Sequence, residues 1–284
     1  MLKKKTKTSI SPIELIIILL AASLIVFRSV SEYYLKSPVP LTITHINSPF
    51  LNITTSNIKY DGRGVTLKLD RHSDCPVIII GSIYNKPISN VEISNLTIDG
   101  NRFEQTREYW KHTERGVINN SGIVIQNARN VTIHNIIIKN CKSGGIVTTL
   151  GVNDILVDRV EVYNSEFDGV ACYETTNSIF SNLNLHNNNA AGISLDNEFN
   201  NNIFFNCTLV DNNTGIFMRN SCGNIFKNII LNNKRFGVFI AQVDKNTNTA
   251  CKNNMFDITR MKTPYDFHIN DASCSNNVNE LPSR

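Results

Sequence analysis

Charged residues are scarce in this 284-residue chain, and neither sign dominates beyond its amino terminus. Lys, Arg, Asp and Glu together make up 18% of the sequence, and the formal net charge is +4. The excess comes from residues 1–30, which carry four lysines and Arg28 against Glu14. The rest of the chain holds equal numbers of basic and acidic residues, so it lacks the basic surface of a nucleic-acid binder.

Long hydrophobic runs are also missing, with one exception near the amino terminus. Residues 13–27 are apolar apart from Glu14 and Ser23, and they follow a Lys-rich head. This pattern predicts a signal anchor, with the head in the cytoplasm and residues 13–30 in the membrane, or else a cleaved signal peptide. In either case we expect export, to a membrane-anchored position in the cell envelope or as a secreted protein.

Aromatic residues make up only 8% of the chain, with a single Trp, whereas asparagine is abundant. Asn accounts for about 14% of the residues and Ile for about 13%, a pairing that average globular composition does not give. Such a bias is typical of a repeating architecture.

Short glycine-initiated segments recur along the chain about every 23 residues. Each begins with Gly, continues with alternating apolar residues, and is followed by two more short strand-like runs separated by Asn-rich corners. The glycines that begin these segments are Gly122, Gly145, Gly169, Gly192, Gly215 and Gly237.

Three short strands per period exclude a solenoid built from helices. A period of about 23 residues is also too short for the blade of a β-propeller. The sequence therefore predicts an all-β fold, a parallel β-helix of about nine coils, preceded by an N-terminal hydrophobic anchor helix. Asparagine suits the corners because it tolerates left-handed backbone and can hydrogen-bond to the Asn of the next coil.

Two runs carry a resemblance to known proteins: Leu96-Thr-Ile-Asp-Gly-Asn101, and Asp168-Gly-Val170 with the glycine segments that follow it. They resemble the right-handed parallel β-helix proteins of the pectin-lyase-like superfamily, most closely polysaccharide lyases and mannuronan C5-epimerases. The resemblance implies a right-handed solenoid over residues 60–270. The expected division is an anchor or signal peptide at 1–30, a stalk and N-terminal cap at 31–59, the solenoid, and a tail at 271–284.

Several motifs of that superfamily are missing. The sequence contains no Gly-His-Gly, no Asp-Asp pair and no Asp-Pro-His-Asp. The corresponding activities cannot be transferred residue by residue, so the candidate site must come from the repeat itself.

Stacking the glycine segments separates inward from outward positions. The residues one and three after each glycine are mostly aliphatic and are expected to point inward, and those two and four after it outward. The outward columns are Val124, Val147, Ala171, Ser194, Phe217 and Phe239, then Gln126, Thr149, Tyr173, Asp196, Arg219 and Ala241.

Tyr173, Asp196 and Arg219 are consecutive members of one outward column, and we expect them to lie on neighbouring strands. A lyase or epimerase must neutralise a sugar carboxylate and remove the proton beside it. Arg219 is the candidate to bind the carboxylate, Asp196 or Glu174 to accept the proton, and Tyr173 to donate one. The structural alternative is a plain cross-strand ion pair between Asp196 and Arg219.

Candidate substrate-binding residues flank this line. Phe217 and Phe239 offer flat apolar surface for a sugar ring, and Asn197 and Asn220 follow the charged residues. An insertion from Asp99 to Ser121 adds Arg107 and Trp110, which we expect to form a rim of the substrate groove, with a capping loop as the alternative.

The six His show no metal-ligand spacing, so we expect no metal and no cofactor. A calcium requirement stays open, although no motif supports it. The expected function is an envelope-exposed protein that binds an acidic polysaccharide and modifies it as a lyase or epimerase. A non-catalytic glycan-binding, adhesin or surface module is the alternative, and the sequence leaves catalysis itself open.

Overall fold

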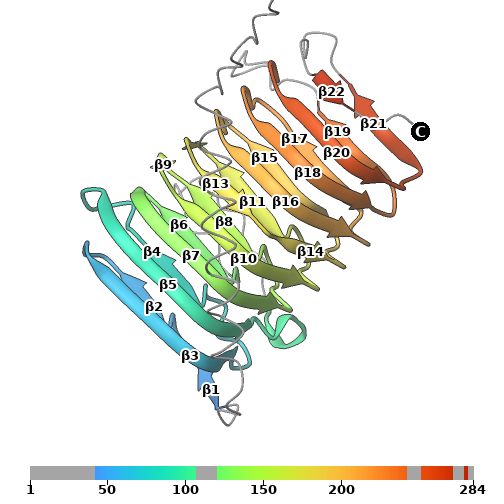
Figure 1. Cartoon of the computed structure of the whole chain (residues 1–284). Helices are drawn as coiled ribbons and strands as arrows, with labels where there is room; N and C mark the ends of the chain where they lie inside the picture. Colours follow the sequence, from blue (N-terminus) through green and yellow to red (C-terminus); the bar gives the residue numbers. More distant parts are fainter. Residues whose placement is uncertain (1–41, 107–119, 242–250, 271–277, 281–284) are drawn as a thin grey trace, which may run out of the picture. The chain divides into compact units, whose positions relative to one another are not determined.

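The computed structural model of the chain describes residues 42–106, 120–241, 251–270 and 278–280. These residues belong to one compact unit, Leu41–Arg284. All strand pairs in the described ranges are parallel, and the strands stack side by side along the molecule from β1 and β2 to β21 and β22 (Figure 1). The single helical element in these ranges is a 3-10 turn, η1 (Arg102–Glu104). The predicted all-β parallel solenoid is confirmed.

The strands form two sheets, which we call sheet A and sheet B. Sheet A contains β1 (Ile43–Ile46), β3 (Ile58–Leu69), β5 (Ile88–Asp99), β7 (Ala128–Lys139), β9 (Val152–Asn153), β10 (Leu156–Tyr163), β12 (Thr175–Thr176), β13 (Ile179–Ser181), β14 (Asn184–His186), β16 (Ile203–Val210), β18 (Ile225–Asn232), β20 (Met255–Met261) and β22 (Val278–Glu280). Sheet B contains β2 (Leu51–Ile53), β4 (Ile78–Ile80), β6 (Ile123–Gln126), β8 (Ile146–Thr149), β11 (Val170–Tyr173), β15 (Ala191–Asp196), β17 (Thr214–Met218), β19 (Phe236–Ile240) and β21 (Tyr265–Ile269).

Successive strands of a sheet pair in the register that the glycine repeat predicts. In sheet B, Val170 pairs with Ile193, Ile193 with Ile216, and Ile216 with Val238. Each pair joins neighbouring coils, and the nine-stranded sheet B corresponds to the expected number of coils. The period of the sequence is therefore the period of the coil.

A left-handed residue bends the course of several coils through sheet A. This position is Asn135 in β7, Asn206 in β16 and Asn228 in β18, with φ of 55°, 55° and 54°. The Asn228 Nδ2 atom donates to Asn206 Oδ1 at 3.0 Å, and Asn135 Nδ2 donates to Asn95 Oδ1 at 3.2 Å. The predicted Asn corners with amide ladders are confirmed.

A second, buried Asn ladder lies at the corner before sheet B. Asn188, Asn212 and Asn233 are 0%, 0% and 5% exposed. The Oδ1 of Asn212 accepts from Asn188 Nδ2 at 3.0 Å, and its Nδ2 donates to Asn233 Oδ1 at 3.0 Å and to the Leu185 carbonyl at 2.9 Å. These side chains satisfy backbone groups that a bend would otherwise leave buried and unpaired.

The repeated glycine has a packing cause. A Cβ built on Gly169 would lie 2.7 Å from the Gly192 carbonyl oxygen, and one built on Gly215 would lie 2.5 Å from the Gly237 carbonyl oxygen. Coils thus approach backbone to backbone at this corner, where any side chain would push them apart.

The core is filled by the columns that the sequence places inward. Ile123, Ile146, Val170, Ile193, Ile216 and Val238 are all fully buried, as are the residues two positions after each. Below sheet A, four phenylalanines form a continuous stack, with ring centroids 4.6, 5.1 and 4.8 Å apart along Phe180, Phe204, Phe226 and Phe256. The inward assignment is confirmed.

Strand pairing extends past the predicted limits of residues 60 and 270. The strands β1 and β2 pair with β3 and β4, so the ladder already includes Ile43, and β22 pairs with β20. The predicted anchor at residues 1–30 lies outside the described residues. In the part of the chain that the structure describes, no helix is long and apolar enough to cross a membrane.

Candidate functional site

The two outward columns form a surface that we call the outer face of sheet B. At its amino-terminal end, Val124, Val147 and Ala171 are 1%, 1% and 3% exposed and form an apolar cluster separate from the core. They point away from the core as predicted, yet they are buried. Burial of an outward column depends on residues remote in sequence, which strand alternation does not reveal.

Asp196 and Arg219 form an ion pair at the centre of this face. The strand β17 ends at Met218, and the Arg219 backbone N–H donates to the Leu195 carbonyl at 2.8 Å, which places Arg219 beside the end of β15. Arg219 Nε lies 2.8 Å from Asp196 Oδ2, and Nη2 contacts the same oxygen. The Asp196 side chain is 6% exposed and that of Arg219 is 38% exposed. The carboxylate is thus buried, while part of the guanidinium faces solvent.

The other oxygen of Asp196 is used locally. Asp196 Oδ1 accepts the backbone N–H of Asn197 at 2.8 Å, and Asn197 has a left-handed φ of 48°. Both carboxylate oxygens therefore have donors, so the main effect of Asp196 in this arrangement is to fix the direction of Arg219.

Tyr173 pairs in register with Asp196 and packs against the apolar cluster. Burial raises the pKa of its phenol well above 10.0, and the negative charges of Asp168 and Asp196 raise it further, while Arg219 lowers it. The phenol therefore stays protonated to a higher pH than that of an exposed tyrosine, and so is able to donate a hydrogen bond.

Asp168 is a buried carboxyl close enough to Tyr173 to raise the pKa of its phenol. It precedes Gly169 at the start of β11 and is 8% exposed. Its Oδ1 accepts the Ala191 backbone N–H at 2.8 Å. Burial raises the pKa of Asp168 to about 6, against the lowering effect of hydrogen bonds from Ala191 and Ser194.

A sequence signal for Asp168 does exist. Neighbouring coils have Gly144, Ala191 and Thr214 at the same position, so an acidic residue stands out among small and uncharged neighbours. A buried carboxyl with a pKa near neutrality is suited to accepting a proton.

The remaining predicted polar residues lie at the corner after sheet B. Glu174 is exposed, with φ 47°, and its backbone N–H donates to the Asn197 carbonyl at 2.8 Å. Asn197 is half-buried. Asn220 is fully buried, and among the described residues neither its Nδ2 nor its Oδ1 has a hydrogen-bond partner, which is unusual for a buried amide.

Phe217 and Phe239 lie in the column next to Asp196 and Arg219. Both are half-buried, and their rings stack with centroids 5.8 Å apart at 19°. The stack continues to His268 of β21, whose ring is 5.2 Å from Phe239 at 6°. The sequence repeat does not identify His268 as a member of this column. Asp266 stands in β21 where the preceding coil has Gly237, so the glycine that marks a repeat is missing there.

Arg107 and Trp110, the predicted rim residues, lie outside the described residues. The described start of their insertion contacts the solenoid, because Arg102 Nη1 donates to the Asn164 carbonyl at 2.6 Å. In the ranges that the structure describes, no group of three or more His, Cys, Asp or Glu side chains is placed to hold a metal ion.

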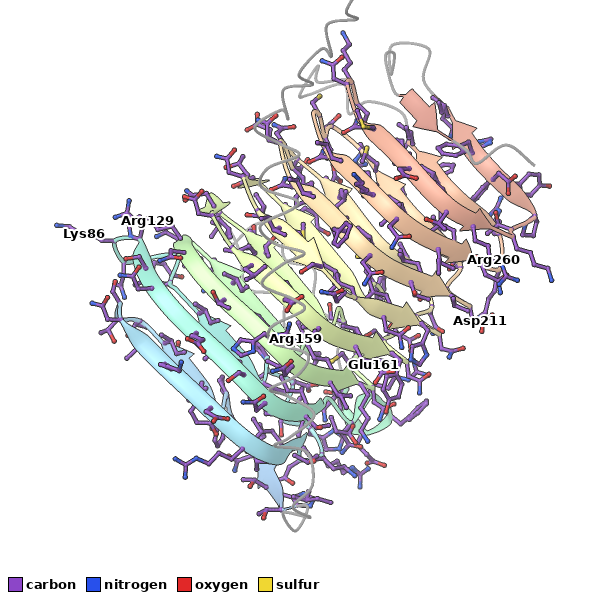
Figure 2. The ribbon with its side chains drawn as sticks, viewed as in Figure 1. Lys86, Arg129, Arg159, Glu161, Asp211 and Arg260 are labelled. Carbon is purple, nitrogen blue, oxygen red and sulfur yellow. The ribbon has the colours of Figure 1, made fainter. Side chains whose placement is uncertain are left out.

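A second polar group occupies the outer surface of sheet A, where Figure 2 labels Arg159 and Glu161 on β10. Glu161 Oε1 lies 3.0 Å from His186 Nε2 and accepts from Asn184 Nδ2 at 3.0 Å. The His186 ring stacks on Tyr163 with centroids 5.0 Å apart. These contacts give His186 a structural role.

Comparison with known proteins agrees with this architecture. A family model described as the right-handed beta helix region matches residues 51–256. The chain belongs to this family. This right-handed β-helix protein matches no curated protein.

Several solved structures share the fold. Bacteriophage phi29 gene product 12 has 13% identity and a TM-score of 0.59 over 79% of this chain and 37% of that one. An endo-xylogalacturonan hydrolase from Aspergillus tubingensis has 11% identity and a TM-score of 0.50 over 87% of both chains. The A-module of a mannuronan C-5 epimerase from Azotobacter vinelandii has 13% identity and a TM-score of 0.46 over 86% of this chain and 92% of the module.

The β-helix chain spans between 37% and 48% of the length of the first three phage proteins that it matches. At these identities the likeness concerns the fold, and function must be argued from the site.

Proposed function

We propose that this right-handed β-helix protein binds an acidic polysaccharide on the outer face of sheet B and modifies it as a lyase or epimerase. The observation that carries the proposal is Arg219, a partly exposed guanidinium fixed by the buried Asp196 next to stacked aromatic rings. A guanidinium held in one direction is suited to a carboxylate, which it can bind through two parallel hydrogen bonds.

The surrounding groups supply the chemistry that follows binding. With the sugar carboxylate on Arg219, a base removes the proton from the adjacent carbon. In elimination, the electron pair of that C–H bond forms a C=C bond as the neighbouring C–O bond to the next sugar breaks, and the leaving oxygen takes a proton. In epimerisation, the carbon is instead reprotonated from its opposite face.

Asp168 is the better candidate for the base, since its pKa of about 6 gives both a carboxylate at neutral pH and useful basicity. Glu174 is the other candidate, at the exposed corner. Tyr173 remains protonated and is the candidate donor. Asp196 then positions Arg219, because its two oxygens are already occupied.

The name of one structurally similar protein supports a polysaccharide as the substrate. The endo-xylogalacturonan hydrolase, by its name, acts on a polysaccharide, and it shares this fold along most of both chains. The location proposed is outside the cytoplasm, either anchored in the membrane through residues 13–30 or secreted, and it rests on the apolar run of the sequence.

A non-catalytic glycan-binding or surface module is the second candidate. The occupied oxygens of Asp196 favour it, because in that reading the ion pair serves to join two strands and to present one cation. Both candidates bind glycan at Arg219, and only the first needs Asp168 and Tyr173.

The test uses the purified full-length chain and a panel of acidic and neutral polysaccharides, with and without calcium, followed by proton NMR and a binding titration. Catalysis predicts unsaturated ends or inverted sugar signals that disappear in Asp168→Asn and Tyr173→Phe. Arg219→Gln, which keeps a donor for Asp196, should abolish binding of the acidic polymers.

Lys59→Ala is the matched control, because it removes a cation from the Lys59–Glu92 pair on sheet A. Binding without turnover supports the glycan-binding module. Equal binding by Arg219→Gln and the parent chain contradicts both candidates.

A further inference from the structure

The carboxyl-terminal coils carry an aromatic surface on the outer face of sheet B that exceeds the two phenylalanines of the sequence prediction. We call it the aromatic platform, and it consists of Phe217, Phe236, Phe239, Tyr265 and His268. Phe236 lies 4.9 Å from Phe239, 5.5 Å from Tyr265 and 5.2 Å from His268 between ring centroids. The rings come from β17, β19 and β21, so the platform crosses three coils.

Part of this platform is open to solvent. Tyr265 is 58% exposed and His268 is exposed, while Phe217 and Phe239 are half-buried. At the other end of the same column the residues are Val124, Val147 and Ala171, which are small, aliphatic and buried. Aromatic residues therefore occupy this column on consecutive coils only at the carboxyl-terminal end of the outer face. The packing of the core does not require them, because the column points away from the core.

Positive charge borders the platform on two sides. The Arg235 guanidinium lies over the Phe236 ring, 4.7 Å from its centroid. Arg219 follows the strand of Phe217 and faces Asp196. The nearby carboxylate of Asp266 is engaged by the Thr263 hydroxyl at 3.1 Å. An anionic ligand with apolar faces complements this combination of rings and guanidinium groups.

We infer that the aromatic platform is a second binding subsite, which holds the sugar residues of an acidic polysaccharide beyond the one bound at Arg219. The inference rests on the proposed function and adds the direction in which the polysaccharide lies on the face. Coils repeat about every 4.8 Å, so a ligand that covers β17, β19 and β21 is a polymer lying along the stacking direction of the coils. The apolar faces of its sugar rings stack on the aromatic rings, and its carboxylates meet Arg219 and Arg235.

The inference predicts that affinity depends on ligand length. The parent polymers should gain contacts at Tyr265 and His268 that a disaccharide held at Arg219 does not make. The experiment compares galacturonate and mannuronate disaccharides with polygalacturonate and alginate in binding titrations. The proteins are the full-length chain, the double variant Tyr265→Ala/His268→Ala, and Tyr84→Ala.

Tyr84 is the matched control because it is an aromatic residue that is 85% exposed and lies outside sheet B. The double variant should bind the polymer at least about fivefold more weakly, since two stacking contacts are lost, and bind disaccharides unchanged. Tyr84→Ala should match the parent chain. Circular dichroism and thermal melts check folding, which exposed side chains should leave intact.

The outcomes separate the two proposals. Polymer binding that depends on Arg219 but is unchanged in the double variant overturns the aromatic platform alone. Equal weakening for disaccharide and polymer also overturns it, since the residues would then belong to the Arg219 site. Failure of both polymers to bind overturns the platform together with the proposed function.

Discussion

The Asp196 carboxylate is buried under the Arg219 guanidinium, with Nε to Oδ2 at 2.8 Å and the second carboxylate oxygen bonded to the Asn197 backbone. The pair differs from an ordinary exposed ion pair because the Asp196 side chain is 6% exposed and that of Arg219 is 38% exposed. The pair therefore fixes one cation at a defined place on the outer face of sheet B.

This arrangement predicts unequal effects of removing the two partners. Arg219→Ala leaves a buried carboxylate without its cation and should lower the free energy of unfolding by about 2 kcal/mol. Adding Asp196→Asn to that variant removes the buried charge, so the double variant should regain part of the loss. Urea denaturation of the three variants measures this.

Lys59→Ala serves as the control for losing a cation, because Lys59 is 71% exposed and its pair with Glu92 should contribute little. A double variant that is less stable than Arg219→Ala alone would contradict the assignment of Asp196 as a buried ion that depends on Arg219.

Asp168 predicts a pH-dependent stability. Its pKa rises from 3.8 to about 6 on folding because burial disfavours the ionised carboxyl. A carboxyl that binds its proton more tightly when folded stabilises the protein fully below pH 3.8, and this contribution is lost as the pH rises through 6.

The variant Asp168→Asn keeps an acceptor for the Ala191 N–H and cannot ionise. It should therefore equal the parent at low pH and become more stable above pH 6, by up to about 3 kcal/mol. Thermal or urea unfolding across the pH range measures the difference. A difference that is constant with pH would mean that Asp168 is not the group whose pKa shifts.

The buried Asn ladder predicts that truncating one of its side chains lowers the free energy of unfolding substantially. Asn212→Ala removes the acceptor of Asn188 and the donor to the Leu185 carbonyl, and it should lower the free energy of unfolding by about 3 kcal/mol. Asn213→Ala is the matched control, since Asn213 is exposed and adjacent. Similar losses at both positions would show that the ladder contributes no more than a surface asparagine.

The phenylalanine stack predicts that truncating one of its rings lowers the free energy of unfolding by the amount usual for a buried aromatic residue. Phe226 contacts Phe204 and Phe256 on either side, so Phe226→Ala should cost about 4 kcal/mol and Phe226→Leu clearly less. Phe103→Ala, at a position 80% exposed, should change little. Denaturant unfolding of the three variants measures this, and a small effect of Phe226→Ala would mean that neighbouring coils close the gap.

Sequence alone determined the solenoid, its period and its inner surface. Alternation along a short strand is a local property, so Ile146, Val170 and Ile193 could be assigned inward from their position after a glycine. Asparagine at the corners was equally predictable, because left-handed backbone and amide pairing depend on one residue and its counterpart in the next coil.

The tertiary structure decided what the outer face of sheet B is able to do. The burial of Val124 and of Asp168 depends on the surroundings that distant parts of the chain create, and a repeat does not encode it. The same holds for the platform at His268, where the marking glycine is replaced and only strand pairing shows that β21 continues the face. Local patterning thus sets which way a side chain points, whereas its exposure, pKa and partners follow from the packing of the whole solenoid.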